Sequence, residues 1–123
     1  MTIKSLYHLV QEGEGFSVTS ELFTHARVDG YAVGGSVLHG VFSLLNDDLS
    51  FRTFSSEMSK LQGLCTEPTQ VIGAWVDMVD DPNGVVYLEI SDVVSSKQVA
   101  LELAQARGEK AIYDFANSKS IYL

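Results

Sequence analysis

Two apolar segments on either side of a turn constrain the fold more than any other part of this sequence. Residues 71–78 alternate between two sets of side chains with a period of two, which is the pattern of a strand. Residues 80–84 read Asp-Asp-Pro-Asn-Gly, and an Asn-Gly pair between two apolar runs is the strongest short signal for a β-hairpin. Residues 85–90 return as the second strand. The sequence therefore predicts an antiparallel hairpin.

Two further segments have the features of helices. Between residues 51 and 64 an apolar side chain recurs every three or four positions, and these residues form one stripe on a helix: Phe51, Phe54, Met58, Leu61 and Leu64. Residues 95–98, Ser-Ser-Lys-Gln, fit a capping box in which Ser95 caps a second helix and Gln98 reaches back. Gly108 is a good C-terminal stop for that helix. Its predicted buried face comprises Val99, Leu103 and Ala106.

The remaining segments predict shorter elements. Residues 3–10 have the spacing of one or two helical turns, and strands are predicted at 16–18, 30–35 and 110–115. Glycines at both ends of 30–35 indicate a backbone that bends or is closely approached. Residues 19–29 stay open between loop and helix, and residues 37–45 between strand and helix. We expect a single α+β domain over 1–123: a small antiparallel or mixed sheet with a central hairpin, backed by about two helices.

The charge of the chain limits its partners. Eight Lys and Arg face sixteen Asp and Glu, so the net charge is −8. No basic residue falls between Lys60 and Lys97, where the acidic residues are Glu67, Asp77, Asp80, Asp81, Glu89 and Asp92. A negative field repels nucleic acid and attracts basic surfaces, because contacts with phosphate need Lys and Arg. We therefore expect no direct nucleic-acid contact, although an acidic excess also serves simply to keep a small protein in solution.

No sequence pattern indicates catalysis, a metal or a cofactor. The histidines His8, His25 and His39 are far apart, and no His or Cys cluster has zinc spacing. Cys65 is alone and is expected to be a small buried hydrophobe. Gly34-Gly35-Ser36 fits neither a nucleophile elbow nor a glycine-rich nucleotide loop. We expect a protein that is not an enzyme; a pocket where Ser36, His39 and a carboxylate converge would favour the opposite.

Signals for export or membrane insertion are missing from the sequence. The first residues lack the apolar run of a signal peptide, and no window approaches the ~18 uninterrupted apolar residues of a membrane span. A single cysteine cannot form an internal disulfide, which fits a reducing compartment. The expectation is a soluble cytoplasmic protein without membrane contact, in its own cell or in a host cell.

The acidic hairpin is the candidate binding site. Carboxylates lie on both sides of its turn and along its second strand, and each strand carries one large aromatic residue. The predicted binding residues are Asp77, Asp80, Asp81, Glu89, Asp92, Trp75 and Tyr87. Asp and Asn are also ordinary turn residues, because their side chains bond to the local backbone. The hairpin is therefore either a binding face or only a solvated turn.

Five short stretches together resemble a known family. They read GFSV, GYAVGG, GAWVD, VYLEIS and AIYDF, and they span Gly15–Val18, Gly30–Gly35, Gly73–Asp77, Val86–Ser91 and Ala111–Phe115. Their order and spacing are similar to those of an uncharacterised small domain of actinobacterial and phage or mobile-element proteins. The resemblance brings no catalytic residues with it. It implies a phage–host or mobile-element setting, in which small acidic proteins often inhibit host defence.

These observations lead to two hypotheses about function. The first is a non-enzymatic protein-binding module whose acidic hairpin meets a basic protein surface, as in an inhibitor of host defence of the anti-CRISPR or anti-restriction type. The second is an accessory or structural domain that self-associates, or docks to a phage or host protein, through an apolar patch of Tyr31, Trp75 and Tyr87. In both hypotheses the partner is a protein.

Overall fold

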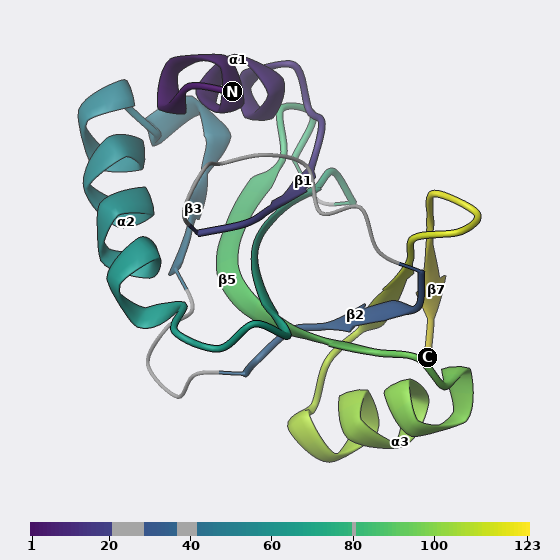
Figure 1. Cartoon of the computed structure of the whole chain (residues 1–123). Helices are drawn as coiled ribbons and strands as arrows, with labels where there is room; N and C mark the ends of the chain where they lie inside the picture. The colour runs from purple at the N-terminus through teal and green to yellow at the C-terminus, as the bar shows by residue number, and fades with distance from the viewer. Residues whose placement is uncertain (21–28, 37–41, 80) are drawn as a thin grey trace.

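A computed structural model describes residues 1–20, 29–36, 42–79 and 81–123. The described strands form one antiparallel sheet that curls into a half-barrel (Figure 1). Their order across the sheet is β1-β4-β5-β2-β6-β7, and β3 also pairs with β5. The strands are β1 (Phe16–Val18), β2 (Tyr31–Val33), β3 (Phe42–Leu45), β4 (Gln70–Asp77), β5 (Val85–Val94), β6 (Ala111–Asp114) and β7 (Lys119–Tyr122).

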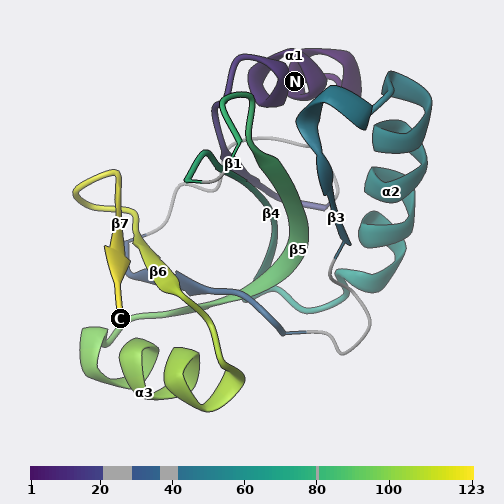
Figure 2. The same ribbon diagram turned by 180° about the vertical axis from the view of Figure 1, so that it is seen from behind.

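Three helices pack on the outer, convex face of the curled sheet. The helix α1 (Ile3–Gln11) and the helix α2 (Phe51–Leu64) cover the part built from β1, β3, β4 and β5. The helix α3 (Lys97–Arg107) lies below β2 and β6, on the other side of the bend (Figures 1 and 2). The predicted α+β class is confirmed, and the sheet is antiparallel rather than mixed. The short N-terminal segment is also a helix, so three helices back the sheet in the described part of the chain.

The predicted hairpin is the longest strand pair in the sheet. β4 and β5 pair from Gln70 opposite Asp92 to Asp77 opposite Val85. The connection is residues 78–84, which is longer than the two-residue turn that Asn-Gly favours. Within it, the Asp81 carboxylate accepts hydrogen bonds from the amides of Asn83 (2.9 Å) and Gly84 (3.2 Å).

The second edge of β5 is divided between two strands. β3 pairs with its first half, Val85–Leu88, and β2 pairs with its last residues, Asp92–Val94. Between them the chain leaves the ladder at residues 34–36, where the Ser36 amide still donates to the Ile90 carbonyl at 3.2 Å. The predicted bend at the end of the 30–35 strand is confirmed, and Gly35 has φ +74°.

The main core lies between the convex face and the first two helices. On β4 and β5 every second side chain points to that face, as strand alternation requires. The predicted stripe on α2 is confirmed at Phe54, Met58 and Leu61, which are buried, whereas Phe51 and Leu64 are exposed at the two ends of the helix. The core residues from the sheet include Ile72, Val76, Val86, Leu88 and Ile90.

The predicted start of α3 is wrong by one residue. Ser96, not Ser95, is the N-cap: its hydroxyl accepts a hydrogen bond from the Val99 amide at 3.3 Å. Two adjacent serines offer the same chemistry, and the sequence does not say at which one the backbone turns helical. The predicted end is confirmed, since Gly108 adopts the left-handed conformation with φ +71°.

The predicted buried face of α3 is also wrong. Ala100 and Ala104 are buried, whereas Val99 is 49% exposed and Ala106 is exposed. Leu103 is half-buried against the same small core. Choosing the largest side chains as the core face fails here because small alanines let the helix lie close to the sheet.

The other predicted segments have mixed outcomes. Strands are confirmed at 16–18 and within 30–35 and 110–115. Of the two open segments, residues 42–45 form β3, while residues 21–28 and 37–41 lie outside the described residues. The Asp114 carboxylate accepts hydrogen bonds from Asn117 and stabilises the turn between β6 and β7.

Asn46 joins the hairpin loop to the first helix. It is buried, and its amide group donates to the Val10 carbonyl (2.9 Å) and the Asn83 carbonyl (3.1 Å). Its Oδ1 accepts a hydrogen bond from Gln11 Nε2 at 3.0 Å. A buried amide with all these partners stabilises the fold mainly because each partner would otherwise lack a bond.

Replacing Asn46 with alanine is therefore expected to lower the free energy of unfolding by about 2 kcal/mol, because the buried Val10 carbonyl and the partly buried Asn83 carbonyl lose their donor. Urea denaturation at constant pH measures this change. Ser43→Ala, at an exposed position of β3, is the control and should change stability by less than about 0.5 kcal/mol. Equal effects of the two substitutions would show that the amide does not join these elements.

Candidate functional site

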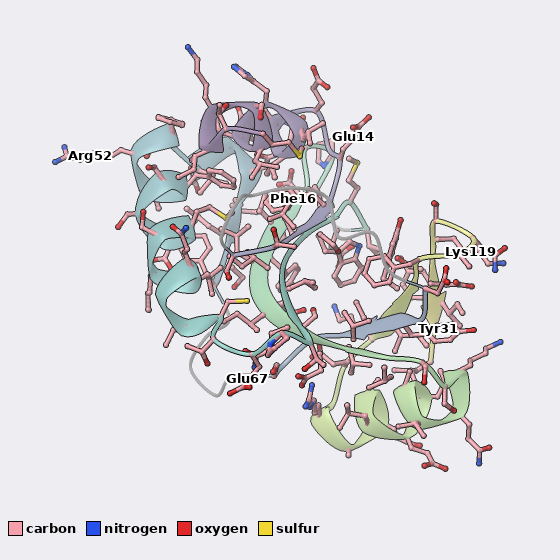
Figure 3. All side chains as sticks on the ribbon, in the orientation of Figure 1. Glu14, Phe16, Tyr31, Arg52, Glu67 and Lys119 are labelled. Atoms are coloured by element: carbon pink, nitrogen blue, oxygen red, sulfur yellow. The ribbon has the colours of Figure 1, made fainter. Side chains whose placement is uncertain are left out.

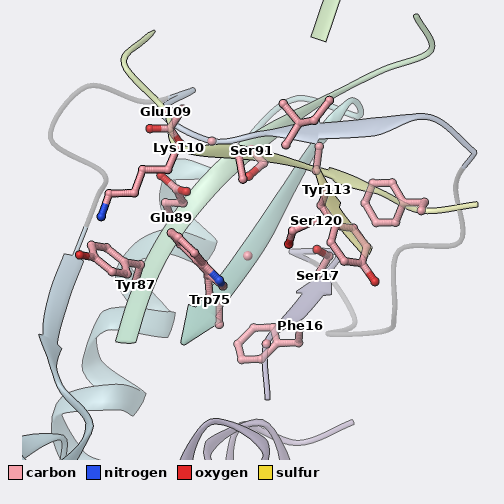
Figure 4. Close-up of a pocket in the computed structure, with 18 of the residues that line it drawn as sticks. Phe16, Ser17, Trp75, Tyr87, Glu89, Ser91, Glu109, Lys110, Tyr113 and Ser120 are labelled. Carbon is pink, nitrogen blue, oxygen red and sulfur yellow. The ribbon is translucent and has the colours of Figure 1, made fainter. Parts of the chain in front are cut away.

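The concave face of the sheet is hollow. Side chains on this face alternate with the core residues of the same strands, and several of them are very small. They leave a cavity of about 820 Å³ that opens to solvent (Figure 4). The small residues of its floor are Ser17, Ala32, Gly73, Ser91, Ala111 and Ser120. This cavity, called the concave pocket below, is the candidate site.

Aromatic rings form the walls of the concave pocket. Trp75 and Tyr87 face each other across β4 and β5, with ring centroids 5.6 Å apart and planes at 28°, so the rings stack. Tyr113 and Phe115 meet edge to face at 5.3 Å on the side formed by β6. Stacked and edge-to-face rings hold each other in place, and their free faces offer apolar area to a ligand.

Two glutamates meet at one end of the concave pocket, beside Trp75 and Tyr87 (Figure 4). Glu89 projects from β5, and Glu109 follows α3. Both carboxyl groups lie against Gly34, since an added Cβ there would overlap an oxygen of each. Glycine at position 34 is thus what leaves room for the carboxyl pair.

Glu89 is largely buried beside a second carboxyl group, and both conditions disfavour its charged form. Burial raises the pKa of Glu89 from 4.5 to about 7, and the neighbouring Glu109 charge adds to the increase. The Gly35 amide, which donates to Glu89 Oε2 at 3.1 Å, acts in the opposite direction. Near pH 7 the Glu89 carboxyl is therefore protonated about half of the time.

The basic side chains around the pair are bonded elsewhere. Arg107 donates to Asp92 Oδ2 at 2.7 Å and to the carbonyls of Val33 (3.4 Å) and Gly34 (3.0 Å). Lys110 Nζ lies 3.6 Å from Asp77 Oδ2, which links the start of β6 to the end of β4. These contacts hold the two sides of the curled sheet together.

The structure separates the predicted binding residues into two groups. Trp75, Tyr87 and Glu89 line the concave pocket together. The other described ones have bonds within the chain: Asp77 pairs with Lys110, Asp92 pairs with Arg107, and Asp81 accepts amide hydrogen bonds in the hairpin loop. Asp80 lies outside the described residues.

The predicted apolar patch is divided between the two faces of the sheet. Trp75 and Tyr87 face the concave pocket, whereas Tyr31 packs on the other face against the α3 core.

The predicted turn chemistry of the hairpin is present, since the carboxylates of Asp77 and Asp81 each accept a hydrogen bond from a backbone amide two residues ahead.

Sequence reasoning missed Glu109, Tyr113 and Gly34 as parts of one site. Glu109 follows a helix stop, where an isolated charge is ordinary, and only the curl of the sheet brings it to Glu89. A weaker signal was present in β4, where Gly73 and Trp75 alternate with the apolar Ile72 and Val76. A glycine beside a large aromatic on one strand face is typical of a hollow rather than a packed surface.

The other chemical candidates have ordinary surroundings. Cys65 is buried, as expected, and burial raises the pKa of its thiol. Ser36 accepts a hydrogen bond from Gln70 at 2.9 Å, and His39 lies outside the described residues. Within the described ranges, no three His, Cys, Asp or Glu side chains gather as a metal-ion group would.

Basic residues do not gather on one surface in the described structure. Arg52 points into solvent from α2, and Lys119 lies at the opposite side of the molecule (Figure 3). None of the helices described here is long and apolar enough to cross a bilayer.

Comparison of the chain with protein-family models, with curated proteins and with solved structures gives no match. The resemblance to a phage or mobile-element domain therefore stays a prediction.

The raised pKa of Glu89 makes stability depend on pH. A carboxyl whose pKa is higher in the folded state stabilises the fold below the unfolded pKa, and this contribution is lost as pH rises through the folded value. Here the loss should fall between pH 4.5 and about 7 and amount to roughly 3 kcal/mol. Glu89→Gln should remove it.

Urea denaturation of the native protein and of Glu89→Gln between pH 4.5 and 8 measures this contribution to the free energy of unfolding. The unfolding free energy of the native protein minus that of Glu89→Gln should fall over this window. Glu102→Gln, at an exposed position of α3, is the control and should follow the native curve. A constant difference between the native protein and Glu89→Gln would contradict the buried carboxyl pair.

Proposed function

We propose that this protein acts by binding, without catalysis, a small organic ligand in the concave pocket. The observation that carries the proposal is the floor of small side chains between aromatic walls, because it leaves an open volume where a sheet face normally carries filling side chains.

The size and lining of the concave pocket support this function. Small-molecule sites have volumes of roughly 300–1,000 Å³ and combine apolar walls with a few polar groups that fix orientation. The concave pocket has about 820 Å³, stacked rings on one side, and the carboxyl pair and serine hydroxyls on the others. A flat apolar group between Trp75 and Tyr113 would gain ring contacts on both sides.

Filling the floor tests the proposal. Gly73→Leu directs a side chain into the concave pocket, where an added Cβ meets only ordinary contacts, the nearest at 3.7 Å. We expect this variant to fold and to lose binding of 2-phenylethyl and 2-naphthylethyl compounds in their amine, alcohol and carboxylate forms. Two-dimensional amide NMR spectra measure binding through shifts of the Gly34, Gly35 and Gly73 amides in the native protein.

Gly63→Leu is the matched control, since Gly63 lies on α2 with no atom within 4 Å of an added Cβ. It should bind like the native protein. If no compound of the set shifts the pocket amides of the native protein, or if Gly73→Leu binds as the native protein does, the concave pocket is not a ligand site.

We propose protein binding as a second candidate, in the form that the charge predicts: a module of phage or mobile-element origin that meets a basic surface of a host protein. The net charge of −8 supports it, and so does the end of the hairpin, where Met78 is 48% and Val79 is 84% exposed. Exposed apolar side chains beside carboxylates are typical of a docking surface.

The hairpin end can be tested against purified restriction and CRISPR nucleases. Val79→Ser and Asp81→Asn, combined, should weaken a complex at least tenfold, and rising salt should weaken it further. If neither the substitutions nor rising salt weakens the complex, the contact lies elsewhere. If no complex forms, this candidate function is contradicted.

A further inference from the structure

The concave pocket has an unbalanced charge. Its described lining includes three carboxylates, those of Asp29, Glu89 and Glu109, and one ammonium group, that of Lys110. The Lys110 side chain is 66% exposed and its ammonium group lies 3.6 Å from Asp77, so it is already paired. Among the described lining residues, acidic groups are therefore in excess.

The carboxyl pair has no cation of its own among the described side chains. Arg107 is near enough to lower the pKa of Glu89, but its guanidinium is bonded to Asp92 and to two carbonyl groups. A pair of carboxyls in a partly dry site needs either a proton or an external cation. Without an external cation, protonation of Glu89 meets this need.

The groups beside the pair are suited to an organic cation. Trp75 and Tyr87 lie next to the carboxyls in the concave pocket (Figure 4). The face of an aromatic ring attracts an ammonium group, which contributes up to roughly 2 kcal/mol where water is excluded. Apolar rings give no ligand atoms to a metal ion, which needs more oxygen donors than a carboxyl pair provides.

We infer that the concave pocket selects an organic amine, with its ammonium group bound between the carboxylates of Glu89 and Glu109 and its apolar body against Trp75 and Tyr87. The inference rests on the proposed function, since it names the ligand class of the same pocket.

Binding exchanges one cation for another. The pair with Glu89 protonated takes up R–NH₃⁺ and releases the Glu89 proton to solvent, so the pair becomes a dicarboxylate and no other bond is broken. Because the pKa of Glu89 is about 7, the amine should bind roughly tenfold more weakly at pH 6 than at pH 8. The other charged groups nearby are Arg107, which acts on Glu89, Asp29 and Lys110, which line the concave pocket, and Asp77, which pairs with Lys110.

Calorimetric titration with 2-phenylethylamine, 2-phenylethanol and 3-phenylpropanoate tests the inference. The three probes share a ring and differ in charge. At pH 8 the amine should bind at least tenfold tighter than the alcohol, and the carboxylate should bind most weakly. Near pH 6.5, titration in buffers of different ionisation enthalpy should show proton release with the amine and none with the alcohol.

Glu109→Gln and Glu89→Gln should each remove the preference for the amine while alcohol binding stays unchanged, and Glu102→Gln should keep it. Glu109 is in a loop, so its variant remains informative if Glu89→Gln folds poorly. Alcohol and amine of equal affinity, or tighter carboxylate binding, would overturn the inference and leave the proposed function standing.

Two other outcomes are distinct from these. If none of the three probes binds, the proposed function fails with the inference. If Ca²⁺ or Mg²⁺ at millimolar concentration shifts the Gly34 and Gly35 amides and the amine does not, the carboxyl pair is a metal site and the inference is wrong.

Discussion

The shape of the fold follows from the pairing of β5, because two different strands share one edge of this strand. One edge of this strand is paired with β4 along its length, while the other is shared by β3 and β2, which do not meet. The chain leaves the ladder between them at Gly34–Ser36. A sheet that changes partners along one strand can bend sharply there, and the bend places α3 and β6 opposite the hairpin.

That bend gives the two faces of the sheet opposite roles. The convex face carries large apolar residues against three helices and supplies the stability of the fold. The concave face contributes little to the core, so it can hold glycine, alanine and serine beside aromatic rings and two carboxyl groups. Burying those carboxyls costs free energy, which the core on the other face offsets. The fold tolerates a hollow concave face with two neighbouring carboxyl groups because its core lies on the convex face.

The sequence predicted local features well and long-range ones poorly. The hairpin and the α2 stripe depend on neighbouring residues, and period and turn chemistry are read directly from them. The buried face of α3 was mispredicted because close packing favoured Ala100 and Ala104 over larger side chains. Trp75, Tyr87 and Glu89 were predicted as binding residues, and the structure places all three in the concave pocket. Glu109 could not be predicted, since it meets Glu89 only through the crossing from β5 over α3 to β6.

The Glu89 carboxyl, which lies beside Glu109 and Gly34 in an open pocket, keeps its proton up to about pH 7. Carbon-detected NMR of the glutamate carboxyls during a pH titration tests this most directly, with the Gly35 amide followed in the same samples. One carboxyl should titrate near pH 7, and the Gly35 amide should shift in the same step, because this amide donates to Glu89. If every glutamate titrates near its usual 4.5 and the Gly35 amide is unchanged above pH 6, burial does not keep Glu89 protonated and the carboxyl pair is not as described.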